Sequence, residues 1–117
     1  MEKQNVIVDK SFQFAIRIVE FCELLETKRK FVISHQLLKS GTSIGANVRE
    51  GQNAESKADF IHKMKIAMKE SEETEYWLML CKYSKSYPFD DSLLDENKEI
   101  LKILNSIIST TKRGISK

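Results

Sequence analysis

The scarcity of chain-breaking residues constrains this sequence more than any other feature. Its 117 residues contain only four glycines and one proline. An all-β protein of this length would need many more turn residues, because tight turns depend on glycine and proline. The composition therefore predicts a few long helices joined by short connections. The length suits one domain with one core, spanning residues 1–117.

Apolar residues recur at intervals of three and four in four segments, which is the period of amphipathic helices. We expect helices over residues 9–27 and 30–50, a third that begins after Ser56, and a fourth that Asp91 or Ser92 caps. Short links between long helices force consecutive helices to lie antiparallel. The predicted fold is all-α, an antiparallel up-down four-helix bundle.

Local signals support these boundaries. Ser56 followed by Asp59 is a variant of the capping box, with aspartate in place of the usual Glu or Gln. Gly41 and Gly45 stand inside the second helix, where a glycine costs about 1 kcal/mol relative to alanine. The pair implies that another backbone approaches closely, or that the helix is locally weak. Gly51 is placed to end this helix.

The first helix carries two neighbouring apolar rows that together cover more than half of its circumference. One row is Phe12, Ala15, Ile16, Val19 and Cys22, and the other is Phe14, Ile18, Phe21 and Leu25. A helix at the corner of a monomeric bundle needs a narrower stripe. We therefore expect this helix to meet a neighbouring subunit as well, with Phe14, Ile18 and Phe21 as the oligomer interface.

No catalytic constellation is recognisable. Cys22 and Cys81 lack partners at metal-ligand spacing and are expected to be reduced thiols. The sequence has neither the Glu-x-x-His motifs of di-metal bundles nor a phosphate-binding glycine loop. No histidine is spaced to face Ser40 or Ser43 on their helix. We expect no enzyme activity, no catalytic residue, no metal site and no cofactor.

Polar residues recur at spacings of four, three, four and three along the second helix, directly beside its apolar seam. They are Gln36, Ser40, Ser43, Asn47 and Glu50. Polar groups at a packing boundary are costly unless they are hydrogen-bonded. A structural network with another helix or subunit is the favoured interpretation, and a ligand-binding or recognition strip is the sharper alternative.

The net charge of +2 is small, but basic residues are unevenly distributed. Residues 28–39 contain four basic residues and no acid, and further lysines follow in the third helix. A phosphate-contacting surface is one use for such a distribution. The candidate nucleic-acid-binding residues are Lys28, Arg29, Lys30, Lys39, Lys65 and Lys69. With no membrane-length apolar run and no secretory signal in the first ten residues, we expect a cytoplasmic protein without a membrane partner.

The segment from Gln36 to Gly51, QLLKSGTSIGANVREG, resembles the signature of the small "four helix bundle protein" family. Some members of that family are encoded by intervening sequences within bacterial large-subunit ribosomal RNA genes. The matching positions are Gln36, Leu37, Lys39, Ser40, Ser43, Ile44, Ala46, Asn47, Glu50 and Gly51. Further along, Ser56, Phe60, Ile66, Ala67, Ser71 and Glu75 also resemble the family, so that the specific match covers residues 31–83.

The resemblance implies a left-handed bundle that assembles into a homo-oligomeric ring, a homopentamer. The chain is also similar to the accessory protein of diversity-generating retroelements, a basic pentamer that associates with reverse transcriptase and nucleic acid. RNA or DNA association is therefore the first functional hypothesis, and a purely protein-binding scaffold is the alternative. Three departures are Lys39 where arginine is usual, Gln52 after Gly51, and Asp59 in place of glutamate. Lysine lacks the bidentate fork of arginine, which weakens the expectation of phosphate binding at position 39.

Overall fold

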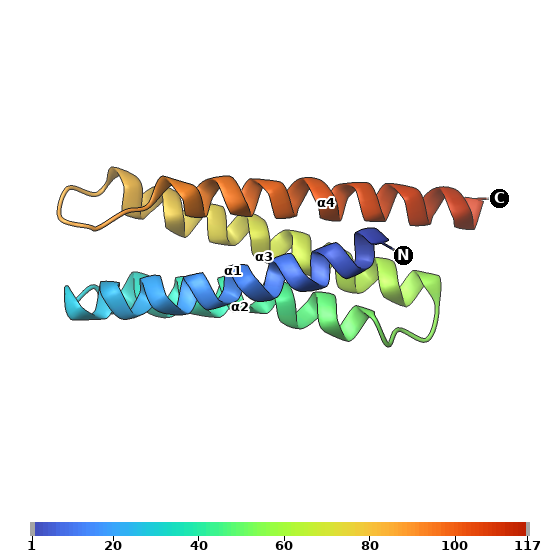
Figure 1. Ribbon diagram of the computed structural model, residues 1–117, viewed down its shortest axis with the longest axis horizontal. Coiled ribbons are helices and arrows are strands. Elements are labelled where there is room, and N and C mark those ends of the chain that lie inside the picture. Colours follow the sequence, from blue (N-terminus) through green and yellow to red (C-terminus); the bar gives the residue numbers. More distant parts are fainter. Residues whose placement is uncertain (1, 117) are drawn as a thin grey trace.

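The computed structural model describes the backbone of residues 2–116 and the side chains of residues 6–114. This part of the chain contains four helices and no strand, which confirms the all-α fold class. The helices are α1 (Glu2–Thr27), α2 (Phe31–Gly51), α3 (Lys57–Tyr83) and α4 (Asp91–Ser116). Figure 1 shows them side by side, with the three connections at alternate ends of the long axis.

Each helix contacts two others around one core. The pairs whose backbones lie close together are α1–α2, α2–α3, α3–α4 and α1–α4, and within the described residues the backbones of α1 and α3, and of α2 and α4, stay apart. The molecule measures 52 × 21 × 20 Å, so its length is set by the helices themselves. The described chain is therefore a rod with four sides, in which α1 and α3 occupy opposite corners.

The helices begin and end close to the predicted residues, with one exception. The prediction started the first helix near Asp9, but α1 already begins at Glu2. Ile7 explains the difference, because it lies seven residues before Phe14 on the same face and is fully buried with it. No glycine or proline interrupts residues 2–8, so the helix continues outward from that contact.

Side chains cap two of the helices. The Ser56 hydroxyl accepts a hydrogen bond from the Asp59 N–H at 3.0 Å, which confirms the predicted start of α3. The predicted cap of α4 was wrong by one residue. Asp90 provides it, since its carboxylate accepts a hydrogen bond from the Ser92 N–H at 3.0 Å and Asp91 is already the first helical residue.

The α1–α2 connection is a tight reversal with an unusual residue. The Lys30 N–H bonds to the Leu25 carbonyl and the Arg29 N–H to the Glu26 carbonyl, both at 2.8 Å. This is the Schellman pattern that closes many helices, in which glycine usually occupies the left-handed position. Arg29 occupies it here, with φ of 63°. The left-handed backbone conformation of Arg29 therefore carries a small conformational energy cost.

All four helices contribute to one apolar cluster. Its largest fully buried side chains include Phe14 and Ile18 of α1, Leu37 and Ile44 of α2, Met64 and Leu78 of α3, and Leu93 and Leu104 of α4. Burying an aliphatic or aromatic side chain of this size contributes about 1.5–3 kcal/mol. Hydrophobic burial along the whole rod is therefore the main source of stability.

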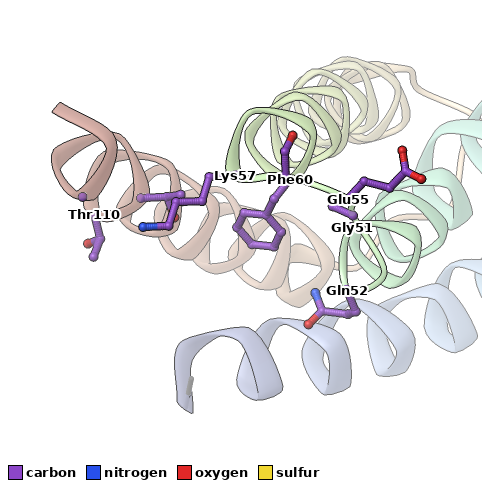
Figure 2. Close-up of a pocket in the computed structure, with 10 residues that line it drawn as sticks. Gly51, Gln52, Glu55, Lys57, Phe60 and Thr110 are labelled. Atoms are coloured by element: carbon purple, nitrogen blue, oxygen red, sulfur yellow. The ribbon is translucent and has the colours of Figure 1, made fainter. Parts of the chain in front are cut away.

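The glycines of α2 allow close packing against other helices. This agrees with the first interpretation of Gly41 and Gly45, close approach of another backbone. A Cβ at Gly41 would lie 2.8 Å from the Ile18 side chain, and one at Gly45 would lie 3.2 Å from the carbonyl oxygen of Ser11. The backbone of α1 thus approaches α2 directly. Gly51 is similarly crowded against Met64 of α3, and Figure 2 shows its position at the end of α2.

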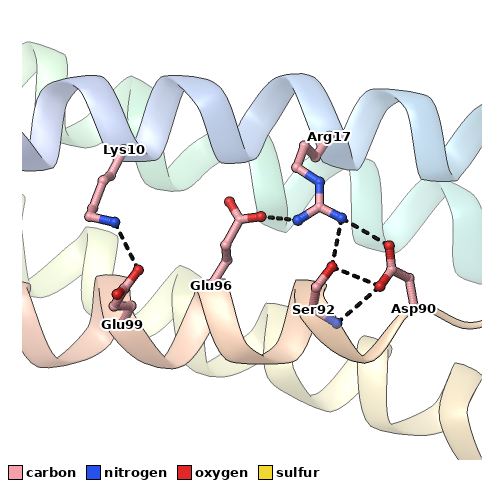
Figure 3. Close-up of polar contacts among 6 residues, drawn as sticks. All are labelled: Lys10, Arg17, Asp90, Ser92, Glu96 and Glu99. Atoms are coloured by element: carbon pink, nitrogen blue, oxygen red, sulfur yellow. Dashed lines mark hydrogen bonds and ion pairs between the residues drawn. The ribbon is translucent and has the colours of Figure 1, made fainter.

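Surface ion pairs cross the boundary between α1 and α4 (Figure 3). Lys10 contacts Glu99 at 2.8 Å. Arg17 contacts both Asp90, at 2.9 Å, and Glu96. Among the described residues, α1 and α4 are the two neighbouring helices that are not consecutive in the sequence, and these pairs orient them.

Candidate functional site

Helix α1 has a second apolar face that points away from the core. Phe12, Ile16 and Val19 are spaced by four and three residues and are 48%, 40% and 41% exposed. We call these three residues the outer face. A helix in a globular protein normally presents one apolar stripe to the core and a polar side to water. The outer face is therefore an unpartnered surface.

The residues predicted to form the oligomer interface lie on the other side of α1. Phe14, Ile18 and Phe21 are 0%, 0% and 7% exposed and pack in the core of the single chain. Their side chains are not available to a second subunit, so that prediction is corrected. Both rows have helical spacing, and the sequence alone did not reveal which of them turns inward.

A shallow groove of about 280 Å³ runs beside the outer face, between α1 and α2. Small residues of α2 line it, notably Thr42, Gly45 and Ala46. At one end Arg49 lies over the ring of Phe12, with its guanidinium carbon 5.5 Å from the ring centroid. We call this the α1–α2 groove. On the α1 side it is lined by Val8, Phe12 and Ala15.

A second exposed apolar row lies on α3, near its C-terminal end. Tyr76, Met79 and Tyr83 are 58%, 39% and 71% exposed. The Tyr76 ring packs edge-on against Trp77, with centroids 5.1 Å apart and an interplanar angle of 72°. The sequence analysis did not single out these three side chains. We call them the α3 row.

The six candidate nucleic-acid-binding residues do not form one surface. Lys28 and Arg29 are exposed at the α1–α2 connection, at one end of the rod. Lys30 is engaged within the chain, since its ammonium bonds to the Ser86 hydroxyl at 3.0 Å and lies 4.9 Å from the centre of the Tyr87 ring. Of these three consecutive basic residues, Lys28 and Arg29 are therefore exposed to solvent, whereas Lys30 is engaged within the chain.

Lys39 and Lys69 lie on facing edges of α2 and α3, near Glu70. Burial raises the pKa of Glu70, the Glu73 charge raises it further, and Lys69 and Lys39 act in the opposite direction. The two lysines are thus partly neutralised by an acid between them.

Lys65 lies beside another lysine that the sequence did not single out. Lys112 of α4 is close enough that the Lys65 ammonium lowers the pKa of Lys112. Two like charges held together on adjacent helices create a locally positive spot, which favours an anion. Helical spacing within one element could not reveal this pair, because its members are 47 positions apart.

The polar strip of α2 makes separate local contacts instead of one network. The Thr74 hydroxyl of α3 donates to the buried Ser40 hydroxyl at 2.9 Å. Asn47 donates from its side-chain amide to the Ser43 carbonyl at 2.8 Å, within its own helix. Glu50 pairs with Lys63 of α3 at 2.9 Å. All of these contacts lie within the single chain. Gln36, the remaining member of the strip, is half-buried at the same edge.

A hollow of about 470 Å³ lies where α2 ends and α3 begins, facing the last turns of α4 (Figure 2). Lys57 and Phe60 point across it toward α4, and Glu55 lies at its rim. Its lining residues include no histidine and no cysteine. Its polar lining residues come from the α2–α3 connection, the start of α3 and the last turns of α4. The two charged ones, Glu55 and Lys57, form no ion pair with each other.

Both cysteines are buried and reduced in the structure. Burial raises the pKa of Cys22 and of Cys81 to about 11. Within the described side chains, no three His, Cys, Asp or Glu residues gather in a way that could hold a metal ion. No helix among residues 2–116 is long and apolar enough to cross a membrane.

Comparisons with known proteins agree with the resemblance found in residues 31–83. The family of 23S rRNA-intervening sequence proteins matches residues 3–106. A solved crystal structure, of a protein of unknown function from the S23 ribosomal protein family of Bacteroides thetaiotaomicron VPI-5482, is 49% identical with a TM-score of 0.87. The match covers 92% of this chain and 98% of that one. No curated protein matches significantly. Because the family match spans most of its length, the chain belongs to the family of 23S rRNA-intervening sequence proteins.

Proposed function

We propose that this protein is a non-enzymatic assembly module, an antiparallel up-down four-helix bundle that associates with itself into a homopentameric ring. The observation that carries the proposal is the outer face of α1. Phe12, Ile16 and Val19 lie on one face of α1 and keep 40–48% of their surface exposed. Contiguous exposed apolar residues rimmed by polar ones are typical of protein–protein contacts. The number five comes from the family resemblance alone.

Light scattering coupled to size exclusion tests self-assembly. The wild-type protein at micromolar concentration should have a mass several times the 13.6 kDa of one chain. Ile16→Glu should reduce that mass while far-ultraviolet circular dichroism stays helical, because a charge on the outer face opposes its burial. Asn105→Glu, on the exposed polar side of α4, is the matched control and should leave the mass unchanged. A monomeric wild-type protein would refute self-assembly.

Association with RNA or DNA is a second candidate function, supported by the Lys65–Lys112 pair. Its two ammonium groups repel each other enough to lower the pKa of Lys112, and a phosphate between them would relieve this repulsion. Lys28 and Arg29 add exposed positive charge at the end of the rod. In a ring each spot is repeated in every subunit, so a modest local charge becomes an extended one.

Salt-dependent binding tests this second function. Contacts with Z phosphates of single-stranded RNA should give a slope of about −0.7Z in a plot of log affinity against log salt concentration. Replacing Lys65 and Lys112 by glutamate should flatten the slope and weaken all sequences alike, since lysine acts on phosphate as a point charge. Lys63→Gln is the matched control, because Glu50 already neutralises this lysine. Mass measurements with and without nuclease treatment show whether nucleic acid copurifies.

The outcome also decides the alternative. No measurable binding to RNA or DNA at about 50 mM salt, where phosphate contacts are strongest, would refute nucleic-acid association. A protein that self-assembles but shows no such binding would then act as a scaffold for other proteins.

A further inference from the structure

Two apolar surfaces of this rod are uncovered, and they lie on opposite sides of it. One is the outer face of α1 with the adjoining α1–α2 groove, and the other is the α3 row. The backbones of α1 and α3 both lie close to those of α2 and α4 but stay apart from each other in the described residues. A single molecule therefore cannot cover one surface with the other.

We propose that the α3 row of one copy docks onto the outer face and the α1–α2 groove of the next copy. The inference rests on the proposed self-assembly and identifies the two surfaces that carry it. Because the two surfaces differ, the contact is heterologous. Copies joined by a heterologous contact close into a ring when the rotation between neighbouring copies is a whole fraction of a full turn. A two-fold dimer built on either surface would bury that surface and leave the other exposed.

The size of the groove suits a side chain from another protein surface. Gly45 and Ala46 are among its lining residues, and its volume of about 280 Å³ lies at the lower limit for small-molecule pockets. A projecting side chain suits it better than a cofactor does. The α3 row supplies exposed side chains, with the Tyr76 ring edge-on to Trp77 and Met79 one turn further along. Tyrosine and methionine are both enriched at protein interfaces.

Charges of both signs flank the two surfaces, and one pair of them is complementary. Arg49 of α2 lines the groove and forms no ion pair with any described residue. Glu72 of α3 lies one helical turn before Tyr76 and likewise lacks an ion pair within the described part of the chain. An ion pair between Arg49 of one copy and Glu72 of the next would fix the orientation of the contact.

The described part of α4 offers no comparable apolar surface. Every exposed residue of α4 between Asp91 and Gly114 is polar, charged or glycine. Phe31 and Val32 are exposed at the start of α2, at the end of the rod next to the basic connection. They belong to neither of the two apolar surfaces.

A mixing experiment with two variants tests the arrangement. Ile16→Glu disables the outer face and keeps the α3 row, whereas Tyr76→Lys disables the α3 row, adds a charge that repels Arg49, and keeps the outer face. Each variant alone should run as a single chain of 13.6 kDa. Mixed in equal amounts, they should form a complex of two chains and no more, because one intact surface from each variant can meet while the remaining two are disabled.

Several results would overturn the proposal. If Tyr76→Lys alone remains as large as wild type, the α3 row is not in the interface. If both variants are monomers but do not combine, the two surfaces do not meet each other. Asn105→Glu controls for an added surface charge, and circular dichroism identifies a variant that fails to fold, in which case Val19→Glu or Met79→Lys replaces it. A monomeric wild-type protein would instead refute the proposed self-assembly itself.

Discussion

Ser71 on α3 and Asn97 on α4 join their helices through two reciprocal hydrogen bonds in the core. The Ser71 hydroxyl donates to the Asn97 side-chain oxygen at 2.8 Å, and the Asn97 amide donates to the Ser71 carbonyl at 2.9 Å. Both residues are almost completely buried. Each polar side chain satisfies the other, so the pair fixes the axial register of α3 against α4.

Replacing Asn97 by alanine should lower the free energy of unfolding by about 1–3 kcal/mol, because it leaves the Ser71 hydroxyl buried without its partner. Urea denaturation followed by circular dichroism measures this change. Asn105→Ala is the control, since Asn105 is exposed on the same helix and its loss should have little effect. Equal stability of the two variants would show that the pair contributes nothing to the folded state.

Gly45→Ala should destabilise the protein, although alanine is the better helix former by about 1 kcal/mol. The new Cβ would lie 3.2 Å from the Ser11 carbonyl oxygen, and backbone cannot move as easily as a side chain. Gly114→Ala is the matched change near the end of α4, where the Cβ meets only the tip of Lys57 at 3.5 Å. Thermal denaturation should therefore give a lower midpoint for the first variant and an equal or higher one for the second.

Arg29→Gly should raise the free energy of unfolding by up to about 1 kcal/mol, because glycine adopts the left-handed conformation without the Cβ penalty. Chemical denaturation measures the gain. If Arg29 contacts phosphate, the same variant should bind RNA more weakly while being more stable. Loss of stability would show that the arginine side chain stabilises the connection more than its backbone geometry costs.

The acid stability of the protein should depend on Asp90. Its hydrogen bonds from Ser92, followed by the nearby Arg17 guanidinium, lower the pKa of this carboxyl in the folded state. A lowered folded pKa stabilises the protein at pH values above the unfolded pKa of about 3.9, and the contribution is lost as the pH falls through the folded pKa.

Asp90→Asn keeps an amide oxygen at the cap but removes the titrating group. Its melting temperature should be below that of wild type at pH 7, and the difference should vanish in strong acid. A difference that stays constant with pH would show that Asp90 acts through its shape and not through its charge.

The sequence predicted the helices well because their period is local information. Scarce glycine and proline, apolar spacing, and the Ser56 cap were enough to place α2, α3 and α4 within a few residues. The extension of α1 to Glu2 depended on Ile7 reaching the core, which is a tertiary contact. The cap of α4 was missed by one residue because Asp90, Asp91 and Ser92 all have suitable side chains, and only the backbone geometry selects Asp90.

The candidate surfaces were predicted less well, for a related reason. The two apolar rows on α1 led to the prediction that this helix contacts a neighbouring subunit. The rows that contain Phe12 and Phe14 have equally regular spacing, so only the packing of α2 and α4 decides which row is buried. Asn97 interrupts the apolar stripe between Leu93 and Ile100, a signal that was present but unused. Lys65 and Lys112 meet across two helices, a relationship that depends on the relative height of α3 and α4.

The boundary between α1 and α4 has a consequence for how the molecule opens. The other three helix contacts join consecutive helices and can form as hairpins. Helices α1 and α4 meet only after the two intervening helices have folded back and brought the first and last helices together. Across this boundary the surface contacts are ion pairs at Lys10 and Arg17 between partly exposed side chains, and salt screens such pairs so that they add little net stability. We expect this seam to form last during folding and to separate first in local fluctuations, with backbone amides along it exchanging with solvent faster than those between α2 and α3.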